Sequence, residues 1–462
     1  MSLTSFVSGL SATQVKGLTT TNVAALDTNA VAALKSEAVA ALSSSQLAVI
    51  ANDEIESLKL SSLSTGALAG LTLGQFQQIN TSATASLTDA QVSGLSTDLV
   101  SQLVSTDIDA LDASQVKSLT SKQLAVLQAD QLSSTSIVNL DATQIAKLSG
   151  TQVTALTSDA AAALTATQLA GMTSDGIAAL EDEDITALFA GASSKIDSLS
   201  TKAIAGLSST DIGLLDAVGG AKLTSDQIKA LSSVQIGALT TDETGSWTSA
   251  QVAALASKQI QALNMAALSS DQQGYLTSAQ ISALSSTQIG AVDDAALDAW
   301  TTEQIGAISS TGVAGLTTDN VAGLDTTQVN ALSSKAFAAL SSANMAVIDS
   351  TVFSGLSSDL VKALSTDKIA GLTTDQVAAM GTAQIGAMSS AQIAALEDGD
   401  LALFDAGEFA AISETALKGL EEDDLMNMTD AQLDELTNAR ESKFSQDQTN
   451  WIIAAYTDPA IS

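Results

Sequence analysis

Four short runs of carboxylates are the residues of this chain whose type and spacing best suit chemistry. They are Glu181, Asp182, Glu183 and Asp184; Asp293 and Asp294; Glu397, Asp398 and Asp400; and Glu421, Glu422, Asp423 and Asp424. Groups that offer only oxygen ligands suit Ca²⁺, so these runs are candidate calcium sites. The alternative is that they replace Ser or Thr at the start of a helix, where the helix dipole favours negative charge. That alternative explains their positions without a metal.

Other kinds of chemistry are removed by composition. The chain has no cysteine and no histidine, so it cannot use disulfides, thiol nucleophiles, Cys/His zinc sites or histidine acid–base catalysis. Ser365 and Lys368 match the S-x-x-K motif, but no partner motif accompanies them. A hydrolase that uses paired carboxylates would need a deep pocket and a perturbed carboxyl pKa. The sequence therefore predicts a protein that is not an enzyme and has no cofactor apart from a calcium ion.

Almost every residue belongs to an eight-residue repeat, which is clearest in LTSAQISALSSTQIGA from Leu276 onward. If Thr277 is the N-cap, Gln280 is the third helical residue, and the two side chains can form a capping box. Leu276 and Ile281 then lie where a hydrophobic staple forms. The repeat runs unbroken from Leu276 to Leu436, and looser copies fill most of the chain before it. One octad thus specifies the start of a helix of about six residues.

The octad predicts an all-α solenoid of very short helices. In one continuous helix, eight residues advance by roughly 800°, so the apolar positions would spread around the axis. Helices this short are unstable alone and must stack on neighbouring octads. A β-solenoid is the alternative, although the octad lacks the alternation of apolar residues expected of strands. The pattern leaves open whether two or three octads make one coil.

The spacing of the repeats is irregular at four places. Five residues separate the leucines at 58 and 63, 127 and 132, and 263 and 268, and eleven separate those at 188 and 199. These steps either correct the twist of the superhelix or place contacts at regular distances. Residues 1–436 are predicted to form the solenoid. Residues 437–462, where the pattern is lost, are predicted to be a capping, assembly or export segment.

The chain is strongly acidic, with 51 acidic and 17 basic residues and a formal charge of −34. Such a surface repels phosphate backbones and anionic lipids, so nucleic acid and the membrane surface are not expected partners. No run of about twenty apolar residues is present, so no transmembrane segment is expected. The start, MSLTSFVSGL, lacks a positive region, so no cleaved N-terminal signal peptide is expected.

The octads, the cysteine-free acidic composition and the final residues DPAIS resemble repetitive bacterial surface and secreted proteins, the group that contains S-layer proteins and large adhesins. The resemblance implies an extracellular or cell-surface location and export through an uncleaved C-terminal signal. The glycine-rich calcium nonapeptides of many such proteins are absent. We predict a structural protein, a rod-like protomer that self-assembles into a homopolymeric filament or layer. The alternative is a solenoid adhesin or interaction scaffold that binds a protein or glycan partner on its concave face.

Overall fold

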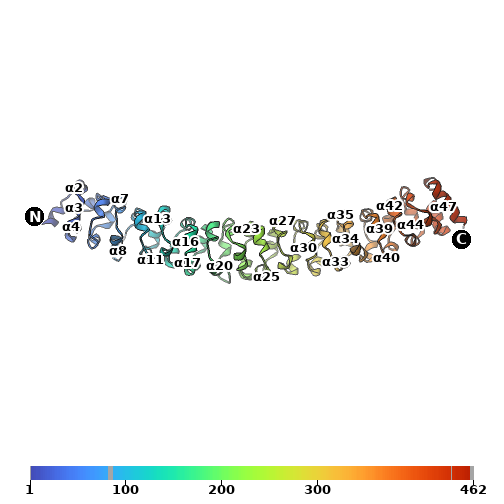
Figure 1. The fold of residues 1–462 in the computed structure, drawn as a ribbon, viewed down its shortest axis with the longest axis horizontal. Coiled ribbons are helices and arrows are strands. Elements are labelled where there is room, and N and C mark those ends of the chain that lie inside the picture. Colours follow the sequence, from blue (N-terminus) through green and yellow to red (C-terminus); the bar gives the residue numbers. More distant parts are fainter. Residues whose placement is uncertain (1, 82–86, 439, 458–462) are drawn as a thin grey trace. The chain divides into compact units, whose positions relative to one another are not determined.

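The computed structural model describes residues 2–81, 87–438 and 440–457 (Figure 1). It divides into two compact units, Met1–Ala238 and Leu239–Ser462. All the regular elements in these described ranges are α-helices or 3₁₀-helices, and no strand occurs among them. The predicted all-α solenoid of short helices is therefore confirmed, and the β-solenoid alternative is wrong.

Most helices have four to six residues, with a few longer ones such as α8 (Leu73–Thr81), α20 (Asp182–Phe189), α46 (Asp430–Thr437) and α47 (Gln446–Thr457). The first unit contains α1 (Leu3–Val7), α2 (Ala12–Lys16), α3 (Thr20–Ala24), α4 (Thr28–Ala33), α5 (Ser36–Ala40), α6 (Ser44–Leu47), η1 (Ile55–Ser57), η2 (Leu60–Ser62), α7 (Thr65–Leu68), α8 (Leu73–Thr81), α9 (Asp89–Val92), α10 (Thr97–Val100), α11 (Ser105–Asp109), α12 (Ala113–Lys117), α13 (Ser121–Val126), η3 (Ala129–Gln131), α14 (Ser134–Ile137), α15 (Ala142–Ile145), α16 (Gly150–Thr154), α17 (Ser158–Ala163), α18 (Ala166–Gly171), α19 (Ser174–Ile177), α20 (Asp182–Phe189), η4 (Ile196–Ser198), η5 (Ile204–Gly206), α21 (Ser209–Gly213), α22 (Ala217–Lys222), α23 (Ser225–Ala230) and α24 (Ser233–Gly237).

The second unit contains α25 (Thr241–Thr244), α26 (Ser249–Ala254), α27 (Ser257–Ile260), η6 (Met265–Ala267), α28 (Ser270–Gln273), α29 (Ser278–Ile281), α30 (Ser286–Ile289), α31 (Asp294–Asp298), α32 (Thr302–Gly306), η7 (Gly312–Gly315), α33 (Thr318–Gly323), α34 (Thr326–Ala331), α35 (Ser334–Ala338), α36 (Ser342–Ala346), α37 (Ser350–Ser354), α38 (Ser358–Lys362), α39 (Thr366–Ala370), α40 (Thr374–Ala378), α41 (Thr382–Ile385), α42 (Ser390–Ile393), α43 (Asp398–Leu401), α44 (Ala406–Ala411), η8 (Leu417–Gly419), α45 (Glu422–Met426), α46 (Asp430–Thr437), η9 (Glu441–Lys443) and α47 (Gln446–Thr457).

Helix α29 shows how one octad folds. The N-cap residue Thr277 is extended, its N–H donates to Gln280 Oε1 at 2.9 Å, and the Gln280 N–H donates to Thr277 Oγ1 at 3.3 Å. Leu276 before the cap and Ile281 in the helix are both buried. The helix ends when the Leu284 N–H turns to the carbonyl of Ile281, three residues back, and the next octad begins. The predicted capping box and staple are therefore confirmed here.

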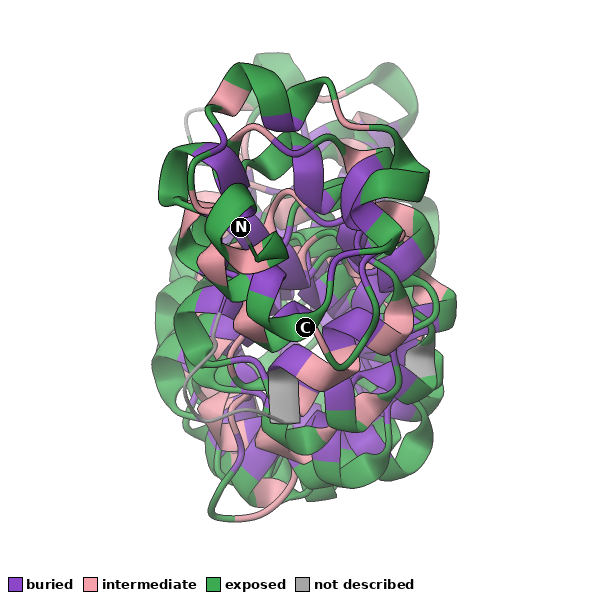
Figure 2. Ribbon diagram, turned by 90° about the vertical axis from the view of Figure 1, so that its left-hand side faces the viewer, coloured by how far each residue is buried: buried purple, intermediate pink, exposed green. Residues whose placement is uncertain are grey.

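Three repeat elements make one coil. In each unit, helices pack on the helix three elements earlier, as α5 does on α2, α32 on α29 and α41 on α38. A regular coil thus contains three octads, which answers the question that the pattern alone left open. Buried residues lie toward the inside of the coiled ribbon and exposed residues toward the outside (Figure 2). The Leu and Ile/Val positions of successive octads form this shared interior.

Buried glutamines join successive coils. The Gln376 amide nitrogen Nε2 donates to the carbonyls of Met345 and Ile348, both at 2.8 Å, while Oε1 accepts from the N-cap N–H of Thr373 at 3.0 Å. One side chain thereby provides a hydrogen-bond partner for the N-cap N–H of its own helix and for two backbone carbonyls in the preceding coil. The two accepting carbonyls lie 31 and 28 residues before Gln376. Other glutamines donate to carbonyls at the same two distances along the chain, namely Gln46, Gln91, Gln123, Gln131, Gln168, Gln227, Gln235, Gln384, Gln392 and Gln448. We call this repeated contact the glutamine ladder.

The five-residue steps preserve the ladder. Gln75 Nε2 donates to the carbonyls of Leu47 and Ile50, which are 28 and 25 residues earlier, because the step at residues 58–63 lies between them. That step folds into the 3₁₀-helix η2, and the step at 263–268 folds into η6. Each five-residue step therefore shortens one coil by three residues and leaves the contact between coils unchanged.

Cationic side chains take the place of glutamine at several positions. Lys195, in the eleven-residue step, donates its ammonium to the carbonyls of Ala162 and Leu164 at 2.9 and 2.7 Å. Lys368 donates in the same way to Leu340. Arg440 donates to the carbonyl of Ile412, 28 residues earlier, at 2.6 Å. Each of these positions keeps a donor for the preceding coil.

The ladder also continues beyond the point where the octad pattern is lost in the sequence. Arg440 and Gln448 both keep the 28-residue spacing. The contact between coils is therefore also made by residues after Leu436, where Arg440 and Phe444 occupy the usual Gln and Leu positions. The capping, assembly or export role of residues 437–462 stays a prediction.

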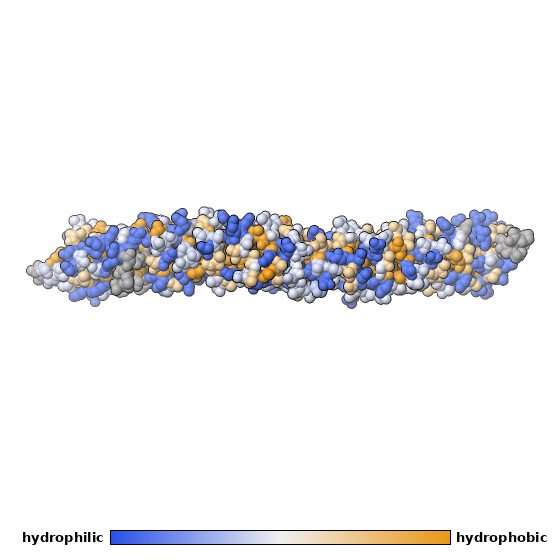
Figure 3. Space-filling view, turned by 90° about the horizontal axis from the view of Figure 1, so that it is seen from below, coloured by the Kyte–Doolittle hydropathy of each residue, from blue (hydrophilic) through white to orange (hydrophobic). Residues whose placement is uncertain are grey.

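Along the face seen in Figure 3, hydrophilic and hydrophobic residues are interspersed. In the ranges that the structure describes, every helix is too short or too polar to cross a bilayer.

Candidate functional site

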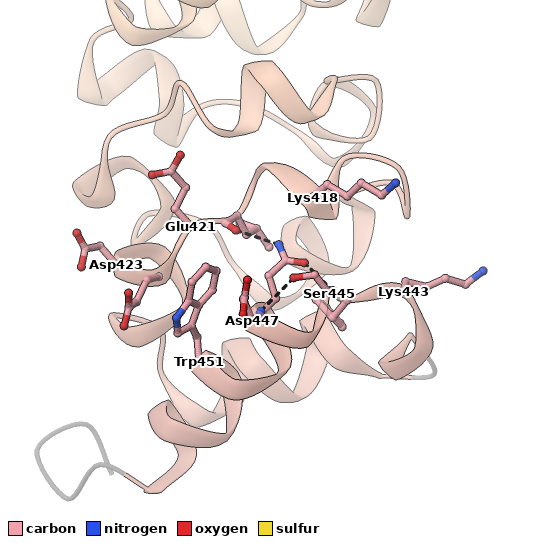
Figure 4. A pocket seen from close by; sticks show the side chains of 11 residues that line it. Lys418, Glu421, Asp423, Lys443, Ser445, Asp447 and Trp451 are labelled. Carbon is pink, nitrogen blue, oxygen red and sulfur yellow. Dashed lines mark hydrogen bonds between the residues drawn. The ribbon is translucent and has the colours of Figure 1, made fainter.

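A pocket of about 840 Å³ opens in the second unit, between the segment from η8 to α45 and the segment from η9 to α47 (Figure 4). Its polar and aromatic walls come from Lys418, Glu421, Glu422, Asp423, Lys443, Phe444, Ser445, Asp447, Gln448 and Trp451. Trp451 stands on the side of the pocket where the labelled carboxylates lie, and Lys418 and Lys443 lie across from it. We call this feature the Trp451 pocket.

Gln448, the last glutamine of the ladder in the described part of the chain, positions the Trp451 pocket. Ser445 caps α47, because the Gln448 N–H donates to Ser445 Oγ at 3.1 Å and the Ser445 N–H donates to Gln448 Oε1 at 3.0 Å. Gln448 Nε2 donates to the carbonyls of Leu417 and Leu420 at 2.7 and 2.9 Å. These bonds hold the start of α47 against the turn between η8 and α45. Trp451 follows three residues later and is half-buried at that junction.

Negative charge dominates the Trp451 pocket. The Lys443 ammonium is 2.8 Å from Glu414 Oε2 and pairs with this carboxylate, which is not part of the pocket lining. The lining also contains Lys418 and four carboxylates, including Asp423 and Asp447. An aromatic face beside carboxylates suits an ammonium or guanidinium group. The pocket can therefore bind an organic cation, whereas its residues do not form a nucleophile and base pair.

All four candidate calcium runs lie at helix starts, and the shortest of them begins α31 with Asp293 as its N-cap. Glu181, Glu397 and Glu421 are the N-cap residues of α20, α43 and α45. The third helical residue is an aspartate in each case, namely Asp184, Asp400 and Asp424, whose carboxylate accepts the N-cap N–H at 3.3, 3.3 and 2.7 Å. The interpretation as helix starts is therefore confirmed. These aspartates occupy the position of the ladder glutamine and are buried.

The remaining carboxylates of these clusters do not converge. Asp182, Glu183, Glu422 and Asp423 are exposed in the first turns of their helices, and the side chain of Asp398 lies outside the described part of the chain. Among the side chains that the structure describes, no group of three or more Asp, Glu, His or Cys is arranged to hold a metal ion. Calcium binding stays a prediction.

Burial perturbs the acidity of Asp400. Its desolvation raises the pKa of the carboxyl, the Glu397 N–H partly offsets this, and the charge of Glu397 raises the pKa further. Lys368 shows the corresponding effect for a base, since desolvation lowers the pKa of its ammonium. Both groups stand at ladder positions, and burial of the side chain is the main cause of each shift.

Two functional features escape sequence reasoning. The capping role of glutamine is visible in the octad, but its bonds to the preceding coil depend on the number of octads per coil. The Trp451 pocket combines residues of η8, α45, η9 and α47. Trp451 is unusual in a chain that is only 3% aromatic, and it was the one sequence feature that could have pointed to this pocket.

The chain matches the ALTTAQ repeat family model at residues 345–382, 361–398 and 369–406. These matches cover part of the second unit and support a repeat protein. No curated protein matches the chain. Among solved structures, the leucine-rich repeat-containing protein LegL7 from Legionella pneumophila is 12% identical, with 62% of this chain and 80% of that chain covered and a TM-score of 0.17. This likeness is too low to support an argument about fold or function.

Proposed function

We propose that this chain is a non-enzymatic structural protein, located outside the cell or on its surface, that assembles with copies of itself into a filament or layer. The observation that carries the proposal is the glutamine ladder. Its buried polar side chains serve helix starts and contacts between coils, as Gln46 does near the start and Gln448 near the end. An interior built in this way suits a load-bearing or spacing role, because each coil supports its neighbours.

Exposed apolar side chains support self-association. Leu3 and Phe6 of α1 are 47% and 57% exposed, and Ile453 and Tyr456 of α47 are 58% and 38% exposed. A small, mainly apolar pocket of about 200 Å³ lies beside these α47 residues, with Ile452 in its wall. A contact between two different surfaces of identical chains propagates as an open polymer when the rotation does not close.

Self-association predicts that the sedimentation coefficient of the full chain rises with protein concentration and that polymers are visible by negative-stain electron microscopy. Replacing Ile453 with serine is expected to weaken association at least tenfold, since a buried apolar side chain contributes about 1.5–3 kcal/mol. Val234→Ser is the matched control, because Val234 is 72% exposed in the middle of the chain. A monomer at all concentrations, with or without calcium, would contradict the assembly.

A second candidate is a solenoid adhesin or scaffold, which the Trp451 pocket favours. An ammonium or guanidinium group of a protein partner fits a half-buried indole among carboxylates. Recognition of this kind needs no catalytic group and is compatible with the same fold.

This binding predicts a saturable change in tryptophan fluorescence when tetramethylammonium or an arginine-rich peptide is added. Trp247 and Trp300 are buried, so Trp451 should report the ligand. Trp451→Leu is expected to abolish the response while the emission of the other two tryptophans remains. An equal response in Trp451→Leu, or no response in the parent chain, would argue against the pocket as a cation site.

A further inference from the structure

One ladder position in the second unit holds a carboxyl group of the same length as glutamine. Glu408 is the third residue of α44, and its Oε2 accepts the Asp405 N–H at 2.9 Å, as a glutamine Oε1 would. The Glu408 N–H donates to Asp405 Oδ1 at 2.8 Å. Glu408 therefore keeps the capping half of the ladder contact.

At Glu408, the hydrogen bond that a ladder glutamine donates to a carbonyl of the preceding coil is missing. Helix α44 packs on α41 as α41 packs on α38. In the α41–α38 pair, Gln384 Nε2 donates to the carbonyl of Leu356, the residue before the cap of α38. The equivalent carbonyl before α41 belongs to Met380, and none of the hydrogen bonds formed by the described residues reaches it. An ionised Glu408 cannot supply that bond, because a carboxylate only accepts.

We infer that the protonation state of Glu408 controls the contact between these two coils. As the neutral acid, Glu408 donates a hydrogen bond from its hydroxyl to the Met380 carbonyl. As the carboxylate, it cannot form this bond, and the contact between the coils is weaker. The step moves one proton between solvent and Glu408 and forms or breaks one hydrogen bond. The neutral carboxyl then has one acceptor oxygen for the cap and one donor for the carbonyl, which is the bonding pattern of a glutamine amide.

Most charged residues on the elements packed against α44 are acidic, but Arg440 is a cation that contacts α44, where its guanidinium donates to the carbonyls of Phe409 and Ala410 at 3.0 and 3.5 Å. Asp405 precedes it in the cap of α44. Of the two helices packed on α44, α41 carries no charged residue and α46 carries Asp430, Asp434 and Glu435. Asp375 lies on α40, just before Met380. Of these charges, that of Asp405 disfavours ionisation of Glu408, and the Arg440 guanidinium is bonded to backbone carbonyls of α44.

Electrostatics agree with this arrangement. Burial raises the pKa of the Glu408 carboxyl above its ordinary value, the Asp405 N–H lowers it in part, and the Asp405 charge raises it. A carboxyl whose pKa is raised on folding binds more protons in the folded state than in the unfolded state. Its contribution to stability is therefore present at low pH and is lost as the pH rises through the folded-state pKa.

The test is hydrogen exchange of α44 and α41 amides in the full chain, measured by mass spectrometry at about pH 4, just below the ordinary glutamate pKa of about 4.3, and at pH 7.5, about three units above it. Glu408→Gln supplies the amide that the ladder uses elsewhere. At pH 7.5 we expect α44 in Glu408→Gln to exchange about tenfold more slowly than in the parent chain, the equivalent of one unit of pKa. At about pH 4 the difference should vanish.

The control is Asp367→Asn, which removes an exposed negative charge from α39 and should leave the ratio of exchange rates near one at both pH values. Equal or faster exchange in Glu408→Gln at pH 7.5, or a difference that does not depend on pH, would overturn the inference. So would calcium that slows exchange in the parent chain at pH 7.5 but not in Glu408→Gln, because a cation would then occupy the place assigned to the proton.

Discussion

Gly206→Ala is expected to destabilise its coil by about 3 kcal/mol, the upper end of the usual range for overpacking. Gly206 ends the 3₁₀-helix η5, which packs on α19. A Cβ atom at this position would lie 2.1 Å from the carbonyl oxygen of Ser174 and 2.9 Å from its carbon. Both are backbone atoms at the start of α19, so no side-chain rotation relieves the clash. The two coils must move apart, which also weakens the neighbouring rungs of the glutamine ladder.

The matched control for this substitution is Gly213→Ala, seven residues later in the same unit. Gly213 is the last residue of α21, and a Cβ there meets no atom within 4 Å. Alanine is a better helix former than glycine, so this variant is expected to be stabilised by up to about 1 kcal/mol. Native-state hydrogen exchange of α19, η5 and α21 measures both effects locally, which suits an array whose coils need not unfold together. Similar exchange in both variants would mean that close backbone approach does not limit the coil spacing.

The local part of the fold could be predicted from the sequence, because each helix start is specified within four residues. Thr277 and Gln280 bond to each other across one turn, and this bond does not depend on any distant segment. The partners of the same Gln280 in the preceding coil, Val252 and Leu255, could not be predicted. Their spacing depends on three octads per coil and on the five-residue step between them. Periodicity alone does not fix either quantity.

The sequence likewise could not predict which glycines allow the backbones of neighbouring coils to approach closely. Gly206, Gly315 and Gly419 each end a 3₁₀-helix, and a Cβ at each would lie within 2.1 Å of a serine carbonyl oxygen. In the octad pattern these glycines look like ordinary small residues near the Leu position. Gly213 occupies a similar context and has open space around it. Only the stacking of coils distinguishes them.

Carboxylates illustrate a different limit of sequence reasoning. Their preference for helix starts was predicted, and Asp184 and Asp424 confirm it. The sequence does not show that they occupy the position whose side chain faces the preceding coil. For the same reason, the sequence presents the acidic runs and the repeated glutamines as separate features. In the structure, an aspartate of each longer run and the glutamine of other octads occupy the same position, the third residue of the helix.

The largest effect on the ladder is expected from Gln384→Met, which replaces the amide by an apolar group of similar length. Gln384 is 3% exposed, accepts the Gly381 N–H at 2.8 Å and donates to the carbonyls of Phe353 and Leu356 at 2.8 and 3.0 Å. Leaving a buried donor or acceptor unsatisfied costs about 1–3 kcal/mol for each group. We therefore expect a loss of about 3–5 kcal/mol, measured as faster hydrogen exchange in α38 and α41 and a lower midpoint of urea unfolding in this unit.

Two further substitutions at Gln384 separate the two halves of the contact. Gln384→Glu keeps the acceptor for Gly381 and loses both donors, so its cost should be large at neutral pH and should fall in acid, where the protonated carboxyl can donate. Gln384→Lys keeps a donor for Leu356, as Lys368 does for Leu340, and loses the acceptor for the cap. Both should be less destabilised than Gln384→Met. If Gln384→Lys were as unstable as Gln384→Met, the bonds between coils would contribute little, and the stability of the solenoid would have to come from its apolar interior.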